Sequence, residues 1–183
     1  GSATVIADVK CSNVLFQEIQ RRGGPPVMWK TGHSLIKAKM KELKAPLAGE
    51  MSGHIFVGER YYGFDDAVYV ALRLIEIFTR EDFDLEVFLR SLPKTFNTPE
   101  IRIDVDEGIK FKLVDALKDS FRDYDVNTTD GVRVNFEDGW ALVRASNTQP
   151  AVIMRFESFS EQGLNRIREM VETLVRKQLD LLA

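Results

Sequence analysis

The sequence contains a single cysteine, Cys11, in 183 residues, so no disulfide can form within the chain. A chain without an internal disulfide suits a reducing compartment, and we expect a cytoplasmic protein. No apolar run approaches the ~20 residues that span a bilayer, and no basic segment followed by an apolar one opens the chain. We therefore expect neither a membrane-spanning helix nor a signal peptide.

An excess of basic residues is also absent. The chain has 25 Lys and Arg against 28 Asp and Glu, which gives a net charge of −3. A nucleic-acid backbone or an anionic membrane is held by a broad basic field, so we expect neither as a partner. Nucleic-acid binding by the second half is further disfavoured because its predicted strands carry few aromatic residues: Phe136, Trp140 and Phe156. Any anionic ligand must bind at a local site.

The length and the 44% hydrophobic content allow one large or two small domains. The segment 91–99 holds two prolines and has no periodicity, which is typical of a domain boundary. We therefore predict two domains, 1–92 and 93–183. The opening Gly1-Ser2 resembles an expression-tag remnant, as on a chain cut from a longer protein.

Strands and helices alternate in the first half. Apolar runs predict strands at 4–9, 27–29, 55–57 and directly after 45–48, and helical periodicity predicts helices at 13–21, 35–43 and 67–80. Ser12, Ser34 and the pair Asp65-Asp66 are the predicted N-caps of these helices. This alternation predicts an α/β domain with a largely parallel sheet.

The second half has a different pattern. Alternating segments predict strands at 100–105, 131–136, 140–143 and 151–157, and a Glu-Asp-Gly turn joins the second to the third. Helices are predicted at 109–121 and from about 160 to 182. We therefore expect a small α+β domain, in which two helices back an antiparallel sheet.

The polar run Arg144-Ala-Ser-Asn-Thr-Gln-Pro150 lies between two of these apolar strands. Arg144 offers a planar fork for two phosphate oxygens, and Ser146, Asn147 and Thr148 offer short donors behind it. The run therefore predicts a phosphate-binding loop. An ordinary polar hairpin loop has the same composition and remains the alternative.

A second polar loop, Gly49-Glu-Met-Ser-Gly-His54, lies between two short strands of the first half. Glu50 and Ser52 together offer acceptors and a donor, as the adjacent hydroxyls of a sugar require. His54 can donate, accept or move a proton near neutral pH. A solvated carboxylate and a packed histidine are the structural alternatives.

Lys10 and His33 each follow a predicted strand of the same sheet. The carboxyl ends of parallel strands lie at one edge, so we expect Lys10, His33 and the Glu50 loop to converge on one crevice. A surface lysine is the alternative for Lys10.

Four ordered motifs give the chain a resemblance to a known family. Asp8-Val-Lys10, Lys30-Thr-Gly-His33, Gly49-Glu-Met-Ser-Gly-His54 and Arg144-Ala-Ser-Asn-Thr148 resemble those of the α-D-phosphohexomutases, and the nearest branch is the bacterial phosphomannomutase/phosphoglucomutase one. Relatives that isomerise glucosamine phosphates typically have Gln in place of Met51. The resemblance covers essentially the whole chain.

The resemblance implies a four-domain parent of which this chain is the third and fourth domains, the third lacking its leading helix. Members carry a phosphoserine loop in the first domain and an Asp-Gly-Asp-Gly-Asp magnesium loop in the second, and neither motif occurs here. The nearest acidic group, Asp104-Val-Asp106-Glu107, is more typical of a solvated turn than of a metal loop. We expect magnesium in the parent enzyme and none held by these residues.

The implied activity is the reversible interconversion of mannose or glucose 1-phosphate and 6-phosphate through a phosphoserine and a bisphosphate intermediate. By motif, Glu50 and Ser52 hold sugar hydroxyls, and Lys10, His33 and His54 line the crevice, where one of them transfers a proton. Arg144, Ser146, Asn147 and Thr148 hold the phosphate that is not transferred. The isolated chain, without the N-terminal domains, is expected to be inactive. A standalone phosphosugar-binding module is the alternative.

Overall fold

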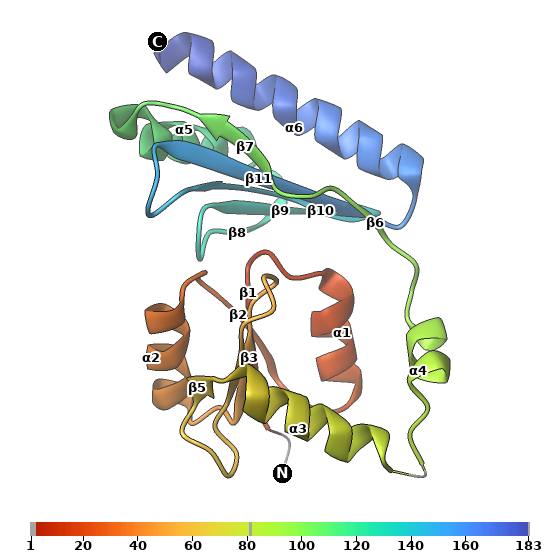
Figure 1. The fold of residues 1–183 in the computed structure, drawn as a ribbon. Helices are drawn as coiled ribbons and strands as arrows, with labels where there is room; N and C mark the ends of the chain where they lie inside the picture. The colour runs from red at the N-terminus through yellow and green to blue at the C-terminus, as the bar shows by residue number, and fades with distance from the viewer. Residues whose placement is uncertain (1–2, 81, 183) are drawn as a thin grey trace. The chain divides into compact units, whose positions relative to one another are not determined.

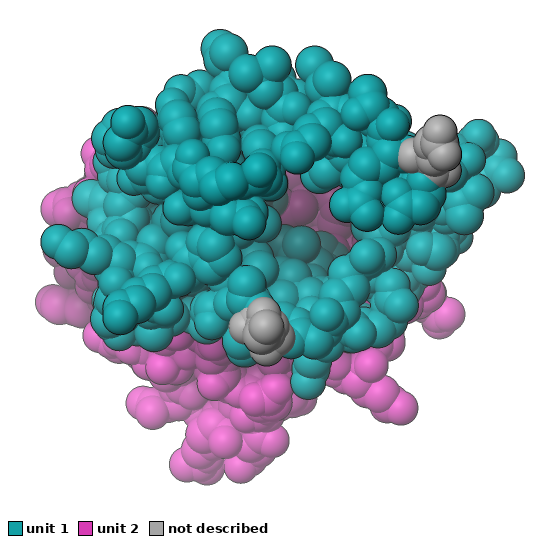
Figure 2. Space-filling view, turned by 90° about the horizontal axis from the view of Figure 1, so that it is seen from below, with its two compact units in different colours: residues 1–93 teal, residues 94–183 magenta. Residues whose placement is uncertain are grey.

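The computed structural model describes residues 3–80 and 82–182, so the predicted tag remnant at 1–2 lies outside the described residues. The chain divides into two compact units, Gly1–Pro93 and Lys94–Ala183, coloured separately in Figure 2. The division falls one residue after the boundary that the two prolines suggest. Each unit has its own sheet and its own hydrophobic core.

The first unit is built on a five-stranded sheet with the order β2-β1-β3-β4-β5. Its strands are β1 (Val5–Asp8), β2 (Pro26–Trp29), β3 (Leu47–Gly49), β4 (Ile55–Val57) and β5 (Phe64–Asp65). β1 pairs in parallel with β2 and β3, whereas the β3–β4 and β4–β5 pairs are antiparallel. The sheet is therefore mixed. Residues 50–54 are too few for a crossover to a parallel strand, so β4 must return beside β3.

Helices cover both sides of this sheet. α1 (Asn13–Arg21) and α2 (His33–Leu43) flank it in Figure 1, and α3 (Ala67–Phe78) and α4 (Leu85–Ser91) follow β5. The core lies between the sheet and α2 and consists of Ile6, Ile36, Met40, Ala45, Ala48 and Phe56. The sequence patterns predict the first three helices but not α4.

Two of the predicted helix caps are confirmed and two are wrong. The Ser12 hydroxyl accepts a hydrogen bond from the Val14 N–H at 3.1 Å, and Asp66 caps α3 through the Tyr69 N–H at 3.0 Å. Ser34 is not a cap, because α2 already begins at His33 behind Gly32. Gly32 has φ +130, which favours glycine and turns the chain into the helix earlier than predicted. Asp65 belongs to β5.

The second unit confirms the predicted antiparallel sheet with two helices. Its strands are β6 (Phe96–Asn97), β7 (Ile101–Asp104), β8 (Asp125–Asn127), β9 (Val132–Phe136), β10 (Gly139–Ala145) and β11 (Ala151–Ser158), and its helices are α5 (Glu107–Ser120) and α6 (Glu161–Leu182). The sheet order is β6-β11-β10-β9-β8, and β7 also pairs with β11. β10 is longer than predicted, because Arg144 pairs with Ile153 and Ala145 with Val152. The polar loop therefore begins at Ser146.

Alternation along the central strands separates the two faces of this sheet. One face packs with α5 and α6 in the core, which includes Val134, Val143, Met154, Leu117 and Val171. The other face carries polar side chains from the same strands. There the Trp140 indole donates to Glu157 at 2.8 Å, and the Arg133 guanidinium lies 3.7 Å from the Trp140 ring centre. By its position in β10, Arg144 belongs to this polar face.

Candidate functional site

Loops that follow β2 and β3 are joined by a buried carboxylate. The Gly32 N–H donates to Glu50 Oε1 at 2.8 Å, and only 3% of the Glu50 side chain is exposed. Gly32 follows β2 and Glu50 follows β3, and these strands lie on either side of β1. Both residues therefore lie at the carboxyl edge of the sheet, where the sequence predicts the site. Glu50 is therefore a positioned acceptor rather than a solvated loop carboxylate.

Asp8, at the end of β1, links the loops at this edge of the sheet. Its Oδ1 accepts from the Met51 N–H at 3.2 Å and from the Cys11 thiol at 3.1 Å, and its Oδ2 accepts from the Thr31 hydroxyl at 3.2 Å. Lys10 Nζ lies 3.9 Å from the same carboxylate. Asp8 therefore ties the loops after all three parallel strands together. The sequence signal for this role was one acidic residue in an otherwise apolar strand.

The two histidines lie beside each other at this edge. Their ring centres are 4.2 Å apart, and His33 Nε2 lies 3.7 Å from Glu50 Oε2. Asp65 contacts both rings, at 2.6 Å from His54 Nδ1 and 3.6 Å from His33 Nε2. The sequence pattern predicts Asp65 as part of a helix cap and gives no sign of its contact with the histidines. The register of β5, in which Asp65 pairs with Phe56, turns it towards the histidines.

Ser52 lies at the exposed tip of the loop between β3 and β4. The loop is closed below it by the Gly53 N–H, which donates to the Glu50 carbonyl at 3.0 Å, and by the Glu50 N–H, which donates to the His54 carbonyl at 2.9 Å. Gly53 has φ +92, a conformation that glycine adopts without strain. The loop thus presents the Ser52 hydroxyl to solvent on a fixed turn.

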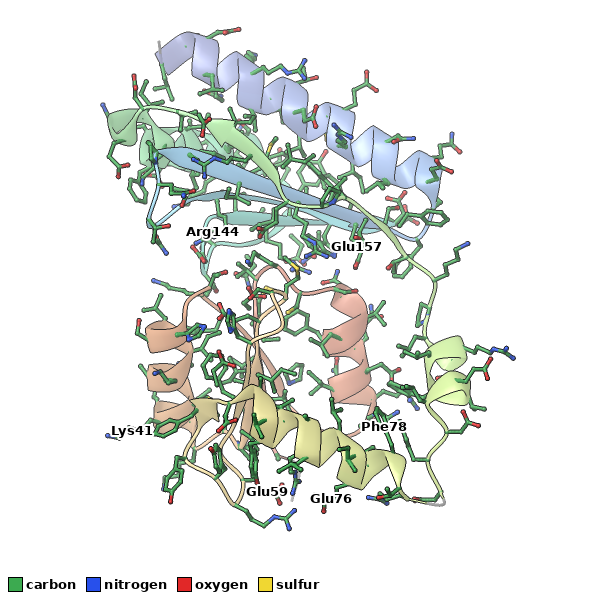
Figure 3. All side chains as sticks on the ribbon, in the orientation of Figure 1. Lys41, Glu59, Glu76, Phe78, Arg144 and Glu157 are labelled. Atoms are coloured by element: carbon green, nitrogen blue, oxygen red, sulfur yellow. The ribbon has the colours of Figure 1, made fainter. Side chains whose placement is uncertain are left out.

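In the second unit, Arg144 is held in place by an acidic neighbour. Its Nε and Nη2 donate to the Asp130 carboxylate at 3.1 and 3.4 Å, and the Arg144 side chain is 8% exposed. Figure 3 labels Arg144 near the end of β10. Gly131 permits this approach, because it has φ +88 and a Cβ there would lie 2.6 Å from the Arg144 Cβ. Asp130 and Gly131 escaped sequence reasoning because the contact is remote in sequence.

The loop that follows is braced from inside. The Ser146 N–H donates to the Ala151 carbonyl at 2.9 Å, and the Thr148 N–H donates to the Ser146 hydroxyl at 3.4 Å. Lys110, on α5, donates to the carbonyls of Ser146 at 2.7 Å and Gln149 at 3.2 Å, with its side chain 2% exposed. Asn147 and Thr148 are exposed. The loop is therefore a fixed platform that presents polar side chains outward.

The two sets of residues have different chemistry. The first offers carboxylate acceptors, imidazoles and one ammonium, which suits neutral hydroxyl groups and proton transfer. The second offers a guanidinium with amide and hydroxyl groups, which suits a phosphate. In the acidic group Asp104 to Glu107, Asp104 pairs with Arg102 at 2.8 Å and Glu107 with Lys110 at 2.6 Å.

Comparison with known proteins assigns both units. Residues 1–96 match the family model described as phosphoglucomutase/phosphomannomutase, alpha/beta/alpha domain III, and residues 100–174 match the model of the C-terminal domain. A phosphomannomutase/phosphoglucomutase of Pseudomonas putida is 49% identical over 98% of this chain and 39% of its own length. The chain thus spans about two fifths of that relative.

Solved structures agree with this assignment. A phosphoglucomutase/phosphomannomutase family protein from Burkholderia thailandensis has a TM-score of 0.86 and 44% identity, over 97% of this chain and 38% of its own. An Aspergillus fumigatus N-acetylphosphoglucosamine mutase in complex with GlcNAc-6P and magnesium shares the fold, with a TM-score of 0.68 and 16% identity over 97% of this chain and 39% of its own. Within residues 3–80 and 82–182, no helix has the length and apolar character needed to cross a membrane.

Proposed function

Because the chain belongs to the phosphoglucomutase/phosphomannomutase family, as its domain III and C-terminal domain, we propose that it is the substrate-recognition half of a hexose-phosphate mutase. The parent enzyme interconverts the 1-phosphate and 6-phosphate of mannose or glucose. The observation that carries the proposal is the Glu50 carboxylate, fixed by Gly32 beside both histidines, in a chain that also holds the Arg144 loop. The sugar phosphate and magnesium in the Aspergillus mutase structure support this substrate class and the parent's need for magnesium.

On the sugar side, Glu50 and Ser52 hold the hydroxyl groups. A carboxylate accepts from two adjacent hydroxyls and a serine both donates and accepts, so the pair tolerates a sugar bound in two orientations. Lys10, His33 and His54 line the same edge. The Asp65 carboxylate, 2.6 Å from His54 Nδ1, orients this ring so that Nε2 is the atom available to a sugar hydroxyl.

On the phosphate side, Arg144, Ser146, Asn147 and Thr148 hold the phosphate that is not being transferred. Asp130 engages two of the five Arg144 N–H donors and fixes the plane of the guanidinium, and the remaining donors are available to phosphate oxygens. Asn147 and Thr148 add neutral donors from the exposed part of the loop. Lys110 keeps the carbonyls of the loop turned inward, away from the anion.

The phosphoserine and the magnesium loop belong to the proposed N-terminal domains of the parent. The residues of this chain therefore bind and orient the substrate but provide no phosphoryl donor. We expect the purified chain to give no hexose-phosphate isomerisation in a coupled assay, and activity that survives removal of contaminating enzyme would contradict this. Adding the N-terminal domains as a separate polypeptide is expected to restore turnover.

A phosphate titration tests the phosphate-binding loop directly. Addition of inorganic phosphate to the labelled chain is expected to shift the amide resonances of residues 144–148 and to leave those of α1 unchanged. Arg144→Lys keeps the charge but loses the planar fork, so it should weaken the response. If residues 144–148 do not respond, the run is the ordinary polar hairpin loop.

A standalone phosphosugar-binding module is the second candidate, supported by the fact that both proposed recognition sets lie on this one chain. The two candidates differ in what precedes residue 3 in the natural gene. A serine loop and an aspartate-rich loop upstream would identify the mutase. A start codon directly upstream would identify the binding module.

A further inference from the structure

We propose that His33, His54 and Asp65 form a binding site for a divalent transition-metal ion of the zinc type. The three side chains each offer one ligand atom, and these atoms all lie within 4.8 Å of one another. They come from three different elements, the start of α2, the loop before β4 and the end of β5. The fold, rather than a local motif, therefore assembles the site.

The distances fit a small ion after a modest movement. In a tetrahedral zinc site with bonds of about 2.1 Å, neighbouring ligand atoms lie about 3.4 Å apart. His33 Nε2 is 3.6 Å from Asp65 Oδ2, close to this value, whereas His54 Nδ1 is 2.6 Å from the same oxygen. The latter pair is hydrogen-bonded and must open by under about 1 Å. Both histidine side chains are nearly half exposed, so they are free to make this adjustment.

Glu50 lies beside His33 but outside the set whose ligand atoms all lie within 4.8 Å of one another. Its Oε2 lies 3.7 Å from His33 Nε2, while its Oε1 is held by the Gly32 N–H. The ligand set is therefore the two imidazoles of His33 and His54 and the one carboxylate of Asp65.

The donor types select the ion. Imidazole suits zinc, copper and nickel, whereas magnesium prefers an all-oxygen set with near-octahedral geometry. The carboxylates of Glu50 and Asp65 both contact the His33 ring, and Asp65 also contacts the His54 ring. The local charge therefore favours a cation, and the imidazoles favour zinc over magnesium.

A bound ion would also affect substrate binding. This consequence, unlike the metal site itself, rests on the proposed function, because His33, His54 and Glu50 are proposed to face the sugar. An ion that takes the His33 and His54 imidazoles as ligands would exclude the hydroxyls that they hold. Zinc is then an inhibitor that competes with the hexose phosphate.

Calorimetric titration of the untagged chain with ZnCl2, without any sugar, tests the metal site independently of the proposed function. We expect one ion to bind per chain and MgCl2 to give no comparable binding. His33→Ala, His54→Ala and Asp65→Asn should each weaken zinc at least about tenfold, since loss of an outer-shell partner alone costs 10–100-fold in metal sites. Glu59→Gln, an exposed carboxylate outside the site, is the matched control and should bind as the wild type does.

A second measurement guards against loss of fold in the variants. His33 and His54 are the only histidines of the chain, so their ring resonances can be followed in the wild-type protein. Both rings should shift together and saturate at one equivalent of zinc. Absence of binding, a shift of one ring alone, or unchanged affinity in His54→Ala would each overturn the proposal.

Discussion

The backbone N–H of Gly32 donates to the Glu50 carboxylate at 2.8 Å, which ties the loop after β3 to the start of α2. The two residues are 18 positions apart, and each belongs to a motif that the sequence singles out. Gly32 makes the contact possible with its φ of +130, since a side chain there would be strained. Glu50 therefore positions the loops as well as offering an acceptor to ligand.

Glu50→Ala is expected to destabilise the first unit. The change removes the charged acceptor of the Gly32 N–H. Loss of a hydrogen bond to a charged group costs about 1–3 kcal/mol. Urea unfolding measures the difference. Glu59→Ala removes an exposed carboxylate that pairs with Arg73 at 3.4 Å, and it should change stability by less than about 0.5 kcal/mol. Equal losses of stability in the two variants would mean that the hydrogen bond between Gly32 and Glu50 does not stabilise the unit.

Gly131→Ala is expected to displace Arg144. The added methyl would clash with the Val143 carbonyl and lie 2.6 Å from the Arg144 Cβ, and φ +88 is strained for alanine, so we expect a loss of about 1–3 kcal/mol. Gly108→Ala is the matched control, because it lies within α5 with open space around its Cβ. There the helix propensity of alanine should stabilise the protein by about 0.5–1 kcal/mol. Thermal unfolding of the pair should give shifts of opposite sign.

Lys110→Met is expected to loosen the phosphate-binding loop. It removes the Lys110 donor from the Ser146 carbonyl, at a cost of about 1–3 kcal/mol, whereas the Gln149 carbonyl keeps the Ala151 N–H at 2.8 Å. Amide exchange in residues 146–150 should accelerate more than exchange in α6. Lys112→Met, at an exposed position of the same helix, should leave both stability and exchange near wild type. Unchanged exchange in Lys110→Met would show that the loop is held by its own hydrogen bonds alone.

Tyr61→Phe is expected to change the titration of Asp66. The Tyr61 hydroxyl donates to Asp66 Oδ2 at 2.5 Å, and this hydrogen bond, with one from the Tyr69 N–H, lowers the pKa of the Asp66 carboxyl. The same bond raises the pKa of Tyr61. Loss of the hydroxyl should move the Asp66 pKa upward, towards the ordinary value, which carboxyl NMR can follow. Tyr62→Phe, at an exposed ring, is the control.

The sign of the resulting pH dependence follows from these directions. Asp66 has a lowered folded pKa, so its contribution to stability is present above its unfolded pKa of about 3.9 and is lost as pH falls through the folded value. Tyr61 has a raised folded pKa, so its contribution is complete below about pH 10 and is lost as pH rises through the folded value. The difference in stability between wild type and Tyr61→Phe should therefore be constant near neutral pH and shrink in strong acid and strong base. A difference that grows in acid would contradict the assignment.

Local patterns predict much of this fold because they report on local structure. Hydrophobic periodicity predicts α1, α3, α5 and α6, and strand alternation predicts the β9–β10 hairpin. The strands β5 and β6 are only two residues long, which is too short for periodicity to detect, and no sequence pattern predicts the three-residue β8. The cap at Ser34 fails because a glycine conformation, invisible to a pattern of side chains, starts the helix earlier.

The candidate site divides in the same way. Glu50, His33 and His54 are predictable because loop composition and strand order point to them. Asp65 and Asp130 are not, since each acts through a partner 11 or 14 residues away whose position depends on strand register. The role of Lys110 is harder still to predict, because an amphipathic helix gives no sign that one of its lysines contacts a loop 36 residues later.

We propose that this chain recognises both the sugar and the phosphate of a hexose phosphate. Titration of the labelled chain with glucose 1-phosphate tests it most directly, with Glu50→Gln as the matched variant and inorganic phosphate as the matched ligand. We predict that glucose 1-phosphate shifts the amides of Gly32, Glu50 and His54 as well as those of residues 146–148. Glu50→Gln should lose the first set of shifts and keep the second, also with inorganic phosphate. Identical responses to glucose 1-phosphate and inorganic phosphate in the wild-type chain would mean that the chain does not recognise the sugar.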